Sequence, residues 1–240
     1  MTKAEKRPFC VSIAGFDPSA GAGLLADIKT FESLKVYGFG VNTANTIQHE
    51  SLVKNVYWLP IETIIEQLDI LLQKYELQYF KIGILPSADY LFKITTFINQ
   101  NNSNSFIIWD PILYSSSGYE IFKVNSNLEK ALVNIDLITP NLPEFQVLKP
   151  KILNTNVYLK GGHNESKKGE DILILKNEQI SIHPQLLNVS PKHGSGCILS
   201  ASILSFLALE NSLVDACKLA KYHTEKVLAS NESLLAYHFR

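Results

Sequence analysis

Residues 190–209 read SPKHGSGCILSASILSFLAL, a glycine turn that leads directly into a long apolar segment. The glycines predict a turn that ends an extended segment and opens a helix. That helix is apolar or small on nearly every side, which is typical of a helix buried inside a sizeable domain. We therefore expect its first turn to lie deep in a cleft.

The turn from Gly194 to Cys197 has the properties of an anion site. Helix N-termini leave backbone N–H groups unpaired and carry a partial positive charge, which favours phosphate. The same field would lower the pKa of the Cys197 thiol. An ordinary buried helix, with a small cysteine filling space, accounts for these residues equally well. The segment is not a Walker-type P-loop, because no Lys-Ser or Lys-Thr pair follows the glycines.

The composition fits a single large domain or two small ones, and α/β folds of this length are commonly one unit. The chain has 240 residues, 46% of them hydrophobic, and 22 Lys and Arg against 23 Asp and Glu give a net charge of −1. This balance gives no electrostatic reason to expect nucleic acid or an acidic membrane as a partner. No segment has the apolar pattern of a membrane span or a signal peptide, so we expect a cytoplasmic protein. The three cysteines form no CxxC pair, which indicates neither a disulfide framework nor a zinc site.

Strand-like and helical segments alternate along most of the chain. This order predicts an α/β fold with a mainly parallel central sheet and helices on both faces. Three late strand-like segments with short polar connections predict an antiparallel edge. The expected strands are residues 9–15, 36–48, 79–84, 105–110, 135–139, 156–160, 172–175 and 179–182. The expected helices lie near residues 24–34, 60–75, 89–99, 128–133, 198–209 and 213–229.

Ligands of such sheets bind beyond the carboxyl ends of the strands, where four side chains suggest a common chemistry. Asp27 is expected in the first turn of a helix, where it could equally offset the helix dipole. Asp110 ends a strand and could merely shape a turn. Glu144 could hold magnesium through water, although Asn141 three residues before it matches a capping box. Lys160 leaves a strand towards the cleft and suits a nucleotide phosphate. Together these are the parts that phosphoryl transfer requires.

A competing interpretation starts from the segment GAGLLA at residues 21–26, which matches the dinucleotide fingerprint of NAD-binding oxidoreductases. The context argues against it. The fingerprint should follow its strand directly, but Gly21 lies well beyond the strand end at Gly15. The next strand end also offers Gln48 and His49 before its first acid, Glu50.

The chain resembles the hydroxymethylpyrimidine/phosphomethylpyrimidine kinases of thiamine biosynthesis, members of the ribokinase-like superfamily. The resemblance lies in segments that follow the family's order and span nearly the whole chain. They are SIAGFDPSAGAG at 12–23, ADIKTF at 26–31, ITPNLPE at 138–144, LKGGH at 159–163 and HGSGC at 193–197.

The resemblance implies one ribokinase-like kinase domain over residues 1–240, expected to be a homodimer. It implies ATP- and Mg²⁺-dependent phosphorylation of 4-amino-5-hydroxymethyl-2-methylpyrimidine, and then of its monophosphate to the diphosphate. Asp27 and Gln48 would hydrogen-bond the pyrimidine. Gly15 and Ile84 would also lie at the substrate, and Ile84 stands where many relatives carry Met.

The same resemblance implies roles for the phosphate side of the site. Asp110 and Glu144 would serve the metal and the phosphates. The nucleotide would contact Lys160, Asn141 and His193. The turn of Gly194, Ser195, Gly196 and Cys197 would form the anion hole, with Cys197 nearest the acceptor hydroxyl as activator or as part of that hole.

Two departures from the family pattern leave other functions open. Only residues 145–159 separate Glu144 from Lys160, where the family usually fits a helix, and the glycine-rich tail of the family is absent. These changes bear on whether both phosphorylation steps are retained. The alternatives are a pyridoxal or pyridoxine kinase and a non-catalytic pyrimidine- or nucleotide-binding protein.

Overall fold

Nine strands in the described part of the chain form one sheet, in the order β3-β2-β1-β4-β5-β6-β7-β8-β9. The structure is a computed structural model that describes residues 7–114, 120–152, 155–163, 169–186 and 189–238. The strands are β1 (Phe9–Phe16), β2 (Tyr37–His49), β3 (Leu52–Trp58), β4 (Tyr79–Ile82), β5 (Phe106–Trp109), β6 (Leu137–Ile138), β7 (Asn156–Leu159), β8 (Asp171–Ile174) and β9 (Gln179–Ile182). The serine-rich loop at 115–118 lies outside the described residues.

Strands β2, β1, β4, β5, β6 and β7 are parallel, as the alternating pattern predicted. The predicted antiparallel edge is formed by β8 and β9. The opposite edge strand β3, antiparallel to β2, was not predicted. Most β3 side chains are exposed or half-buried, so residues 52–58 lack the apolar run of a buried strand.

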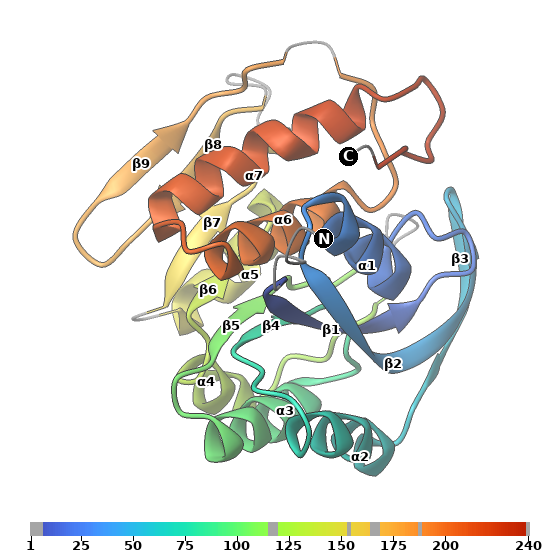
Figure 1. Ribbon diagram of the computed structural model, residues 1–240, viewed down its shortest axis with the longest axis vertical. Coiled ribbons are helices and arrows are strands. Elements are labelled where there is room, and N and C mark those ends of the chain that lie inside the picture. The colour runs from blue at the N-terminus through green and yellow to red at the C-terminus, as the bar shows by residue number, and fades with distance from the viewer. Residues whose placement is uncertain (1–6, 115–119, 153–154, 164–168, 187–188, 239–240) are drawn as a thin grey trace, which may run out of the picture.

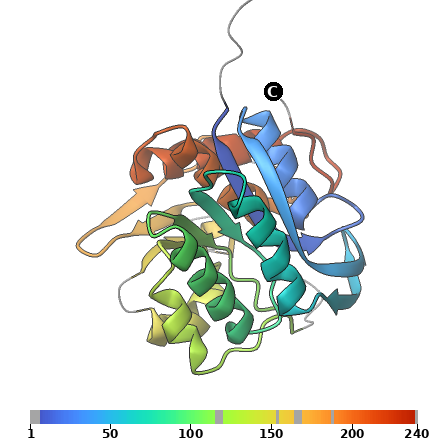
Figure 2. The same cartoon turned by 60° about the horizontal axis from the view of Figure 1, so that its bottom comes forward.

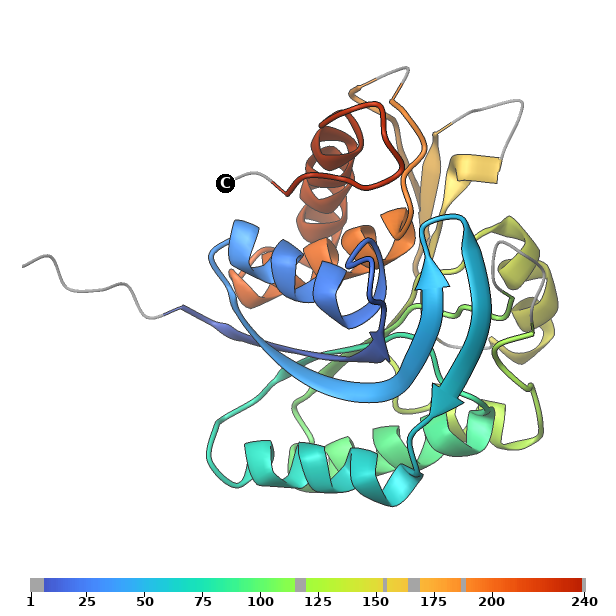
Figure 3. The same ribbon diagram turned by 90° about the vertical axis from the view of Figure 1, so that its right-hand side faces the viewer.

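Helices cover both faces of the sheet (Figure 1). On one face lie α1 (Gly23–Ser33), α6 (Ser195–Ala208) and α7 (Leu213–Leu228); on the other lie α2 (Ile61–Leu72), α3 (Ala88–Asn101) and α4 (Asn127–Leu132). Figure 2 shows α2 and α3 in front of the sheet, and Figure 3 shows the two helical layers on either side of it. The predicted ribokinase-like α/β fold is confirmed.

Helix α6 is the buried helix that its sequence predicted. Eleven of its side chains are buried, and it packs against both α1 and α7. Its N-terminal end therefore reaches the carboxyl ends of the central strands from inside the domain.

No helix was expected between Glu144 and Lys160, but the first part of this segment is helical. Helix α5 (Leu142–Leu148) is followed by the 3-10 turns η1 (Lys149–Lys151) and, after β7, η2 (Gly161–His163). A capping box at Asn141 supplies the local stabilisation that lets so short a helix form.

No helix within the described ranges is long and apolar enough to cross a membrane.

Candidate functional site

A cavity of about 530 Å³ lies at the carboxyl ends of the parallel strands, between them and the start of α6. All the predicted site residues except Asp27 line it. They are Gly15, Gln48, Ile84, Asp110, Asn141, Glu144, Lys160, His193, Gly194, Ser195, Gly196 and Cys197. Segments that are far apart in the sequence thus meet in one hollow, as the strand-end argument predicted.

Strand alternation brings a row of polar side chains to the α6 face. In β5, Ile107 and Trp109 pack on the α2 and α3 side, whereas Ile108 packs on the α6 side, and Asp110 follows the face of Ile108. The same period of two in the neighbouring strands places Ser12, Lys81, Thr139 and Lys160 on this face. Polar groups that no single strand could assemble are therefore side by side.

Asp110 and Lys160 form an ion pair at the floor of the cavity. Lys160 Nζ donates to Asp110 Oδ1 over 2.9 Å, and the Thr139 hydroxyl donates to the same oxygen over 3.0 Å. Burial raises the pKa of Asp110, but the charges of Lys160 and Lys81 outweigh it and keep that pKa below its ordinary value. Burial lowers the pKa of Lys160, but Asp110 and Glu144 outweigh it and keep that pKa raised. Both groups are therefore charged.

The cationic end of Lys160 lies directly beside the glycine turn. A Cβ placed on Gly196 would lie 3.1 Å from Lys160 Nζ and 3.7 Å from Asp110 Oδ2. The ammonium group and the N-terminal end of α6 therefore face the same part of the cavity, which favours an anion there.

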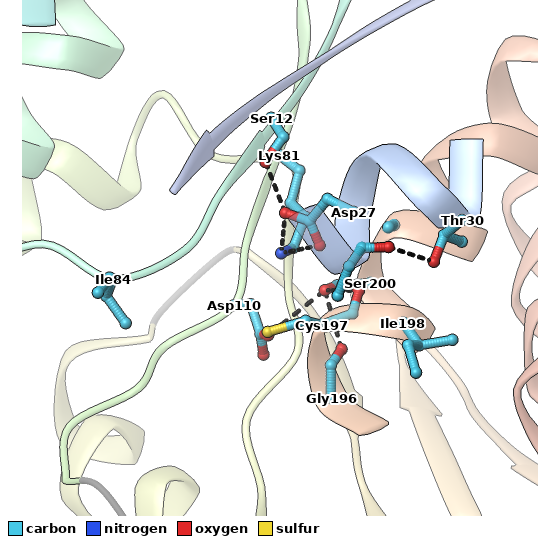
Figure 4. Close-up of polar contacts among 12 residues, drawn as sticks. Ser12, Asp27, Thr30, Lys81, Ile84, Asp110, Gly196, Cys197, Ile198 and Ser200 are labelled. Carbon is cyan, nitrogen blue, oxygen red and sulfur yellow. Dashed lines mark hydrogen bonds and ion pairs between the residues drawn. The ribbon is translucent and has the colours of Figure 1, made fainter. Parts of the chain in front are cut away.

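Asp27 lies in a different place from the one its sequence position predicted. Helix α1 begins at Gly23, so Asp27 is in the second turn and not the first. Its wholly buried carboxylate accepts from the Ser12 hydroxyl over 2.5 Å and from Lys81 Nζ over 2.6 Å (Figure 4). Of Ser12, Asp27 and Lys81, Lys81 is the residue that lines the cavity.

Lys81 is the main site residue that sequence reasoning missed. It is wholly buried in the apolar strand β4, between Phe80 and Ile82. Burial lowers the pKa of Lys81, but the charge of Asp27 outweighs it, so Lys81 stays protonated and the pair is ionic. A lysine inside a short apolar strand was the available signal, because lysine is almost never fully buried unless it is paired.

The turn before α6 requires glycine at its first position. Gly194 has φ of +76°, and a Cβ there would collide with the carbonyl oxygen of Gly21 and lie 2.7 Å from Ala22 Cα. The turn is thus pressed against the loop between β1 and α1.

Cys197 is buried in the first turn of α6, and the predicted lowering of its pKa is wrong. Burial raises the pKa of this thiol to about 11, and the carboxylates of Asp27 and Asp110 add to the rise. The charge of Lys81 and the N–H of Gly23 oppose it without reversing it. Desolvation of the thiolate therefore outweighs the field of the helix, and the resting thiol keeps its proton at neutral pH.

Glu144 forms the capping box that its spacing predicted. The Glu144 N–H donates to Asn141 Oδ1 over 2.9 Å, and the Asn141 N–H donates to Glu144 Oε2 over 2.8 Å. Burial raises the pKa of Glu144 to about 7, although the charge of Lys160 opposes the rise. The carboxyl group also lines the cavity, so its structural role does not remove it from the site.

His193 connects the glycine turn to the loop after β1. Its Nε2 lies 2.9 Å from Asp17 Oδ2, and the same carboxylate accepts from the Ala22 N–H and from Ser19. Burial raises the pKa of Asp17, but the hydrogen bonds from His193 and Ser19 outweigh it and bring the pKa to about 2. Asp17 therefore holds the loop as a fully charged group.

The remaining predicted residues form a less charged wall. Ile84 lies over Gly15, where a Cβ would come within 2.8 Å of Ile84 Cγ1, and Gln48 comes from the end of β2. Val53 and Val56 of the unpredicted strand β3 complete this wall.

The chain is similar in sequence to known phosphomethylpyrimidine kinases. The profile of the phosphomethylpyrimidine kinase family matches residues 17–239. A hydroxymethylpyrimidine/phosphomethylpyrimidine kinase of Staphylococcus aureus (strain MRSA252) is 31% identical over 238 residues, covering 90% of this chain and 86% of the relative.

Solved structures of related kinases have the same fold as this chain. The crystal structure of a phosphomethylpyrimidine kinase from Clostridium difficile 630 matches with a TM-score of 0.72 and 28% identity, over 90% of this chain and 96% of the other. A Staphylococcus aureus pyridoxal kinase in complex with ADP matches with a TM-score of 0.78 and 23% identity, over 94% and 89% of the two chains, and shows the shared fold alone. The resemblance read from the sequence motifs is confirmed: the chain belongs to the phosphomethylpyrimidine kinase family of phosphotransferases.

Proposed function

We propose that this chain transfers the γ-phosphoryl group of ATP to 4-amino-5-hydroxymethyl-2-methylpyrimidine and then to its monophosphate, as one kinase domain of thiamine biosynthesis. The observation that carries the proposal is the cavity itself. One hollow of about 530 Å³ joins a dipole-backed glycine turn and a lysine to a wall of Gly15, Gln48 and Ile84. Family membership supplies the class of substrate and makes ATP the expected phosphoryl donor.

The phosphoryl group would lie between Lys160 and the Gly194–Cys197 turn. A loose phosphoryl-transfer transition state is stabilised mainly by positioned positive charge and N–H donors, with little covalent chemistry for the protein to perform. Lys160 is held in place by Asp110, and the turn is held against Gly21. Contacts within the protein therefore organise both elements.

The state of Cys197 favours a positioning role over that of a resting base. A thiol with a pKa of about 11 is protonated at neutral pH and can donate a weak hydrogen bond, but it cannot accept the proton of the acceptor hydroxyl. We propose that Cys197 contributes to the anion hole beside the acceptor.

Asp110 and Glu144 fit a magnesium site that is completed by the substrate. Mg²⁺ at kinase sites is usually held by one or two carboxylates together with phosphates and water. Both carboxyl groups line the cavity, and no cluster of three or more His, Cys, Asp or Glu that could hold a metal occurs among the described residues. When bound, the ion would neutralise charge on the phosphates.

On the pyrimidine side, we propose that Gln48 pairs with the polar edge of the ring, against Ile84. A site that hydrogen-bonds a polar edge discriminates strongly against analogues that lack it. The direct contact predicted for Asp27 stays a prediction. The buried geometry favours a second role for Asp27, which is to fix the ammonium group of Lys81 at the cavity wall.

Mass spectrometry of reactions with ATP and Mg²⁺ tests the proposal. Hydroxymethylpyrimidine, its monophosphate and pyridoxine are supplied separately. Mono- and diphosphates of the pyrimidine are expected. Phosphate on pyridoxine alone would replace the proposal with the vitamin B6 alternative, and ligand binding without any transfer would favour the binding protein. The expected homodimer rests on the family resemblance, and light scattering of the purified protein tests it.

A further inference from the structure

The segment after α7 turns back and lies beside the segment that leads into α6 (Figures 1 and 3). We call residues 231–235 the C-terminal strap. None of them lines the cavity, and neither does Lys192, which precedes the glycine turn. The contacts between Lys192 and the strap are therefore not explained by the site already described.

Among the described residues, the buried side chain of Lys192 donates its hydrogen bonds to oxygens of the strap. Lys192 is 7% exposed. Its Nζ donates to the Asn231 carbonyl oxygen, to Asn231 Oδ1 over 3.2 Å and to the Ser233 carbonyl oxygen over 2.6 Å. Hydrogen bonds from a charged donor are about twice as strong as neutral ones, so this contact fastens the strap firmly.

The strap has a compact structure of its own. Asn231 Oδ1 accepts from both the N–H and the hydroxyl of Ser233 over 2.8 Å, and Asn231 Nδ2 donates to the Leu235 carbonyl over 3.0 Å. Lys192 therefore donates to a turn that is stabilised by its own hydrogen bonds.

Two further contacts connect the strap to the residues around the glycine turn. The His193 N–H donates to the Leu234 carbonyl over 2.9 Å. A Cβ placed on Gly21 would lie 2.8 Å from Leu235 Cδ2 and 2.7 Å from His193 Cδ2, so Gly21 lies between the strap and the turn. The strap, the loop after β1 and the glycine turn are thus packed together.

We propose that Lys192 is a positioning residue of the kinase, which fixes the Gly194–Cys197 turn through the strap without touching substrate. The inference rests on the proposed role of that turn in phosphoryl transfer. Misplacing catalytic groups by about 1 Å can lower a rate by about 10²-fold, so even a partial release of the turn is measurable.

The test compares Lys192→Met and Lys192→Arg with the removal of a half-buried lysine elsewhere in the protein. Lys192→Met is expected to lower kcat by about 10²-fold with little change in the KM of the pyrimidine. Lys192→Arg, which can still donate to the strap oxygens, should recover most of the loss. The control is Lys221→Met, which removes a half-buried lysine whose Nζ bonds Gly169, Asp171 and Glu225, none of them in the strap or the turn. That variant should keep the wild-type kcat.

A second readout does not depend on catalysis. The three cysteines, Cys10, Cys197 and Cys217, are all buried, and iodoacetamide labelling followed by peptide mass spectrometry follows each one. In Lys192→Met, labelling of Cys197 should accelerate while Cys10 and Cys217 keep their wild-type rates.

Three results would overturn the proposal. They are a wild-type kcat with wild-type Cys197 labelling, equal acceleration of all three cysteines, and an equal loss of kcat in Lys221→Met. The second and third would show a general effect on stability. If the wild-type protein transfers no phosphate, the proposed function fails, but the labelling experiment still decides whether Lys192 orders the turn.

Discussion

Replacing Lys81 with Met should destabilise the protein because it leaves Asp27 buried and unpaired. At the observed 2.6 Å and an effective dielectric constant of about 20, the two charges attract each other by roughly 6 kcal/mol. Much of that attraction offsets the cost of burying both groups. Removal of one partner of such a pair typically costs about 3–5 kcal/mol, because the other charge stays buried.

The measurement is urea unfolding followed by tryptophan fluorescence, since Trp109 is buried in the core. Lys81→Met and Asp27→Asn should each lose about 3–5 kcal/mol of unfolding free energy. The double variant should lose less than either single variant, because no unpaired charge remains. Lys151→Met is the matched control, since its partly exposed pair with Glu129 should contribute at most about 1 kcal/mol.

The pH dependence of the unfolding free energy gives a second test of the ion pair between Lys81 and Asp27. Burial already raises the pKa of the Asp27 carboxyl, and loss of the Lys81 charge in Lys81→Met should raise it further, so the folded state of the variant binds the extra proton. The deficit relative to wild type should therefore grow as pH rises above about 4. Additive losses in the double variant, or a loss in Lys81→Met no larger than in the control, would refute the ion pair. A raised KM for the pyrimidine in Asp27→Asn that the double variant retains would support direct contact by Asp27.

Further predictions concern the turn, the metal and His223. Cys197→Ala should lower kcat by about 10²-fold, the usual cost of one anion-hole donor, and leave pyrimidine binding nearly unchanged; wild-type turnover would remove the thiol from the mechanism. Glu144→Gln should raise the Mg²⁺ concentration needed for half-maximal rate, since Gln can keep the capping box but lacks the charge; an unchanged titration would leave Glu144 with the capping role alone. Burial lowers the pKa of His223 to about 4, so the unfolded state takes the proton first and wild-type stability should fall between pH 6.5 and 4. Unfolding measured across that range should show a smaller fall in His223→Gln and a wild-type fall in the exposed control His183→Gln, and equal curves for all three would contradict the shift.

Some residues of the site could be predicted from sequence patterns, and others could not. The capping box of Asn141 and Glu144 was readable because its partners are three residues apart on one helix start. The strand-end positions of Asp110 and Lys160 were readable because parallel strands end at one edge of a sheet. The burial of α6 was readable from its composition alone.

The sequence by itself determined the α/β order of elements, the glycine turn before α6 and the family to which the chain belongs. Only the tertiary structure decided that Asp27 is paired with Lys81, 54 residues away, and that Lys192 is held by the strap, 39 residues away. It also decided that the thiol of Cys197 is protonated, against the expectation from its helix position. The reason is physical: turns, caps and strand periodicity depend on neighbours in the chain, whereas a pKa or an ion pair depends on every atom that packing brings close.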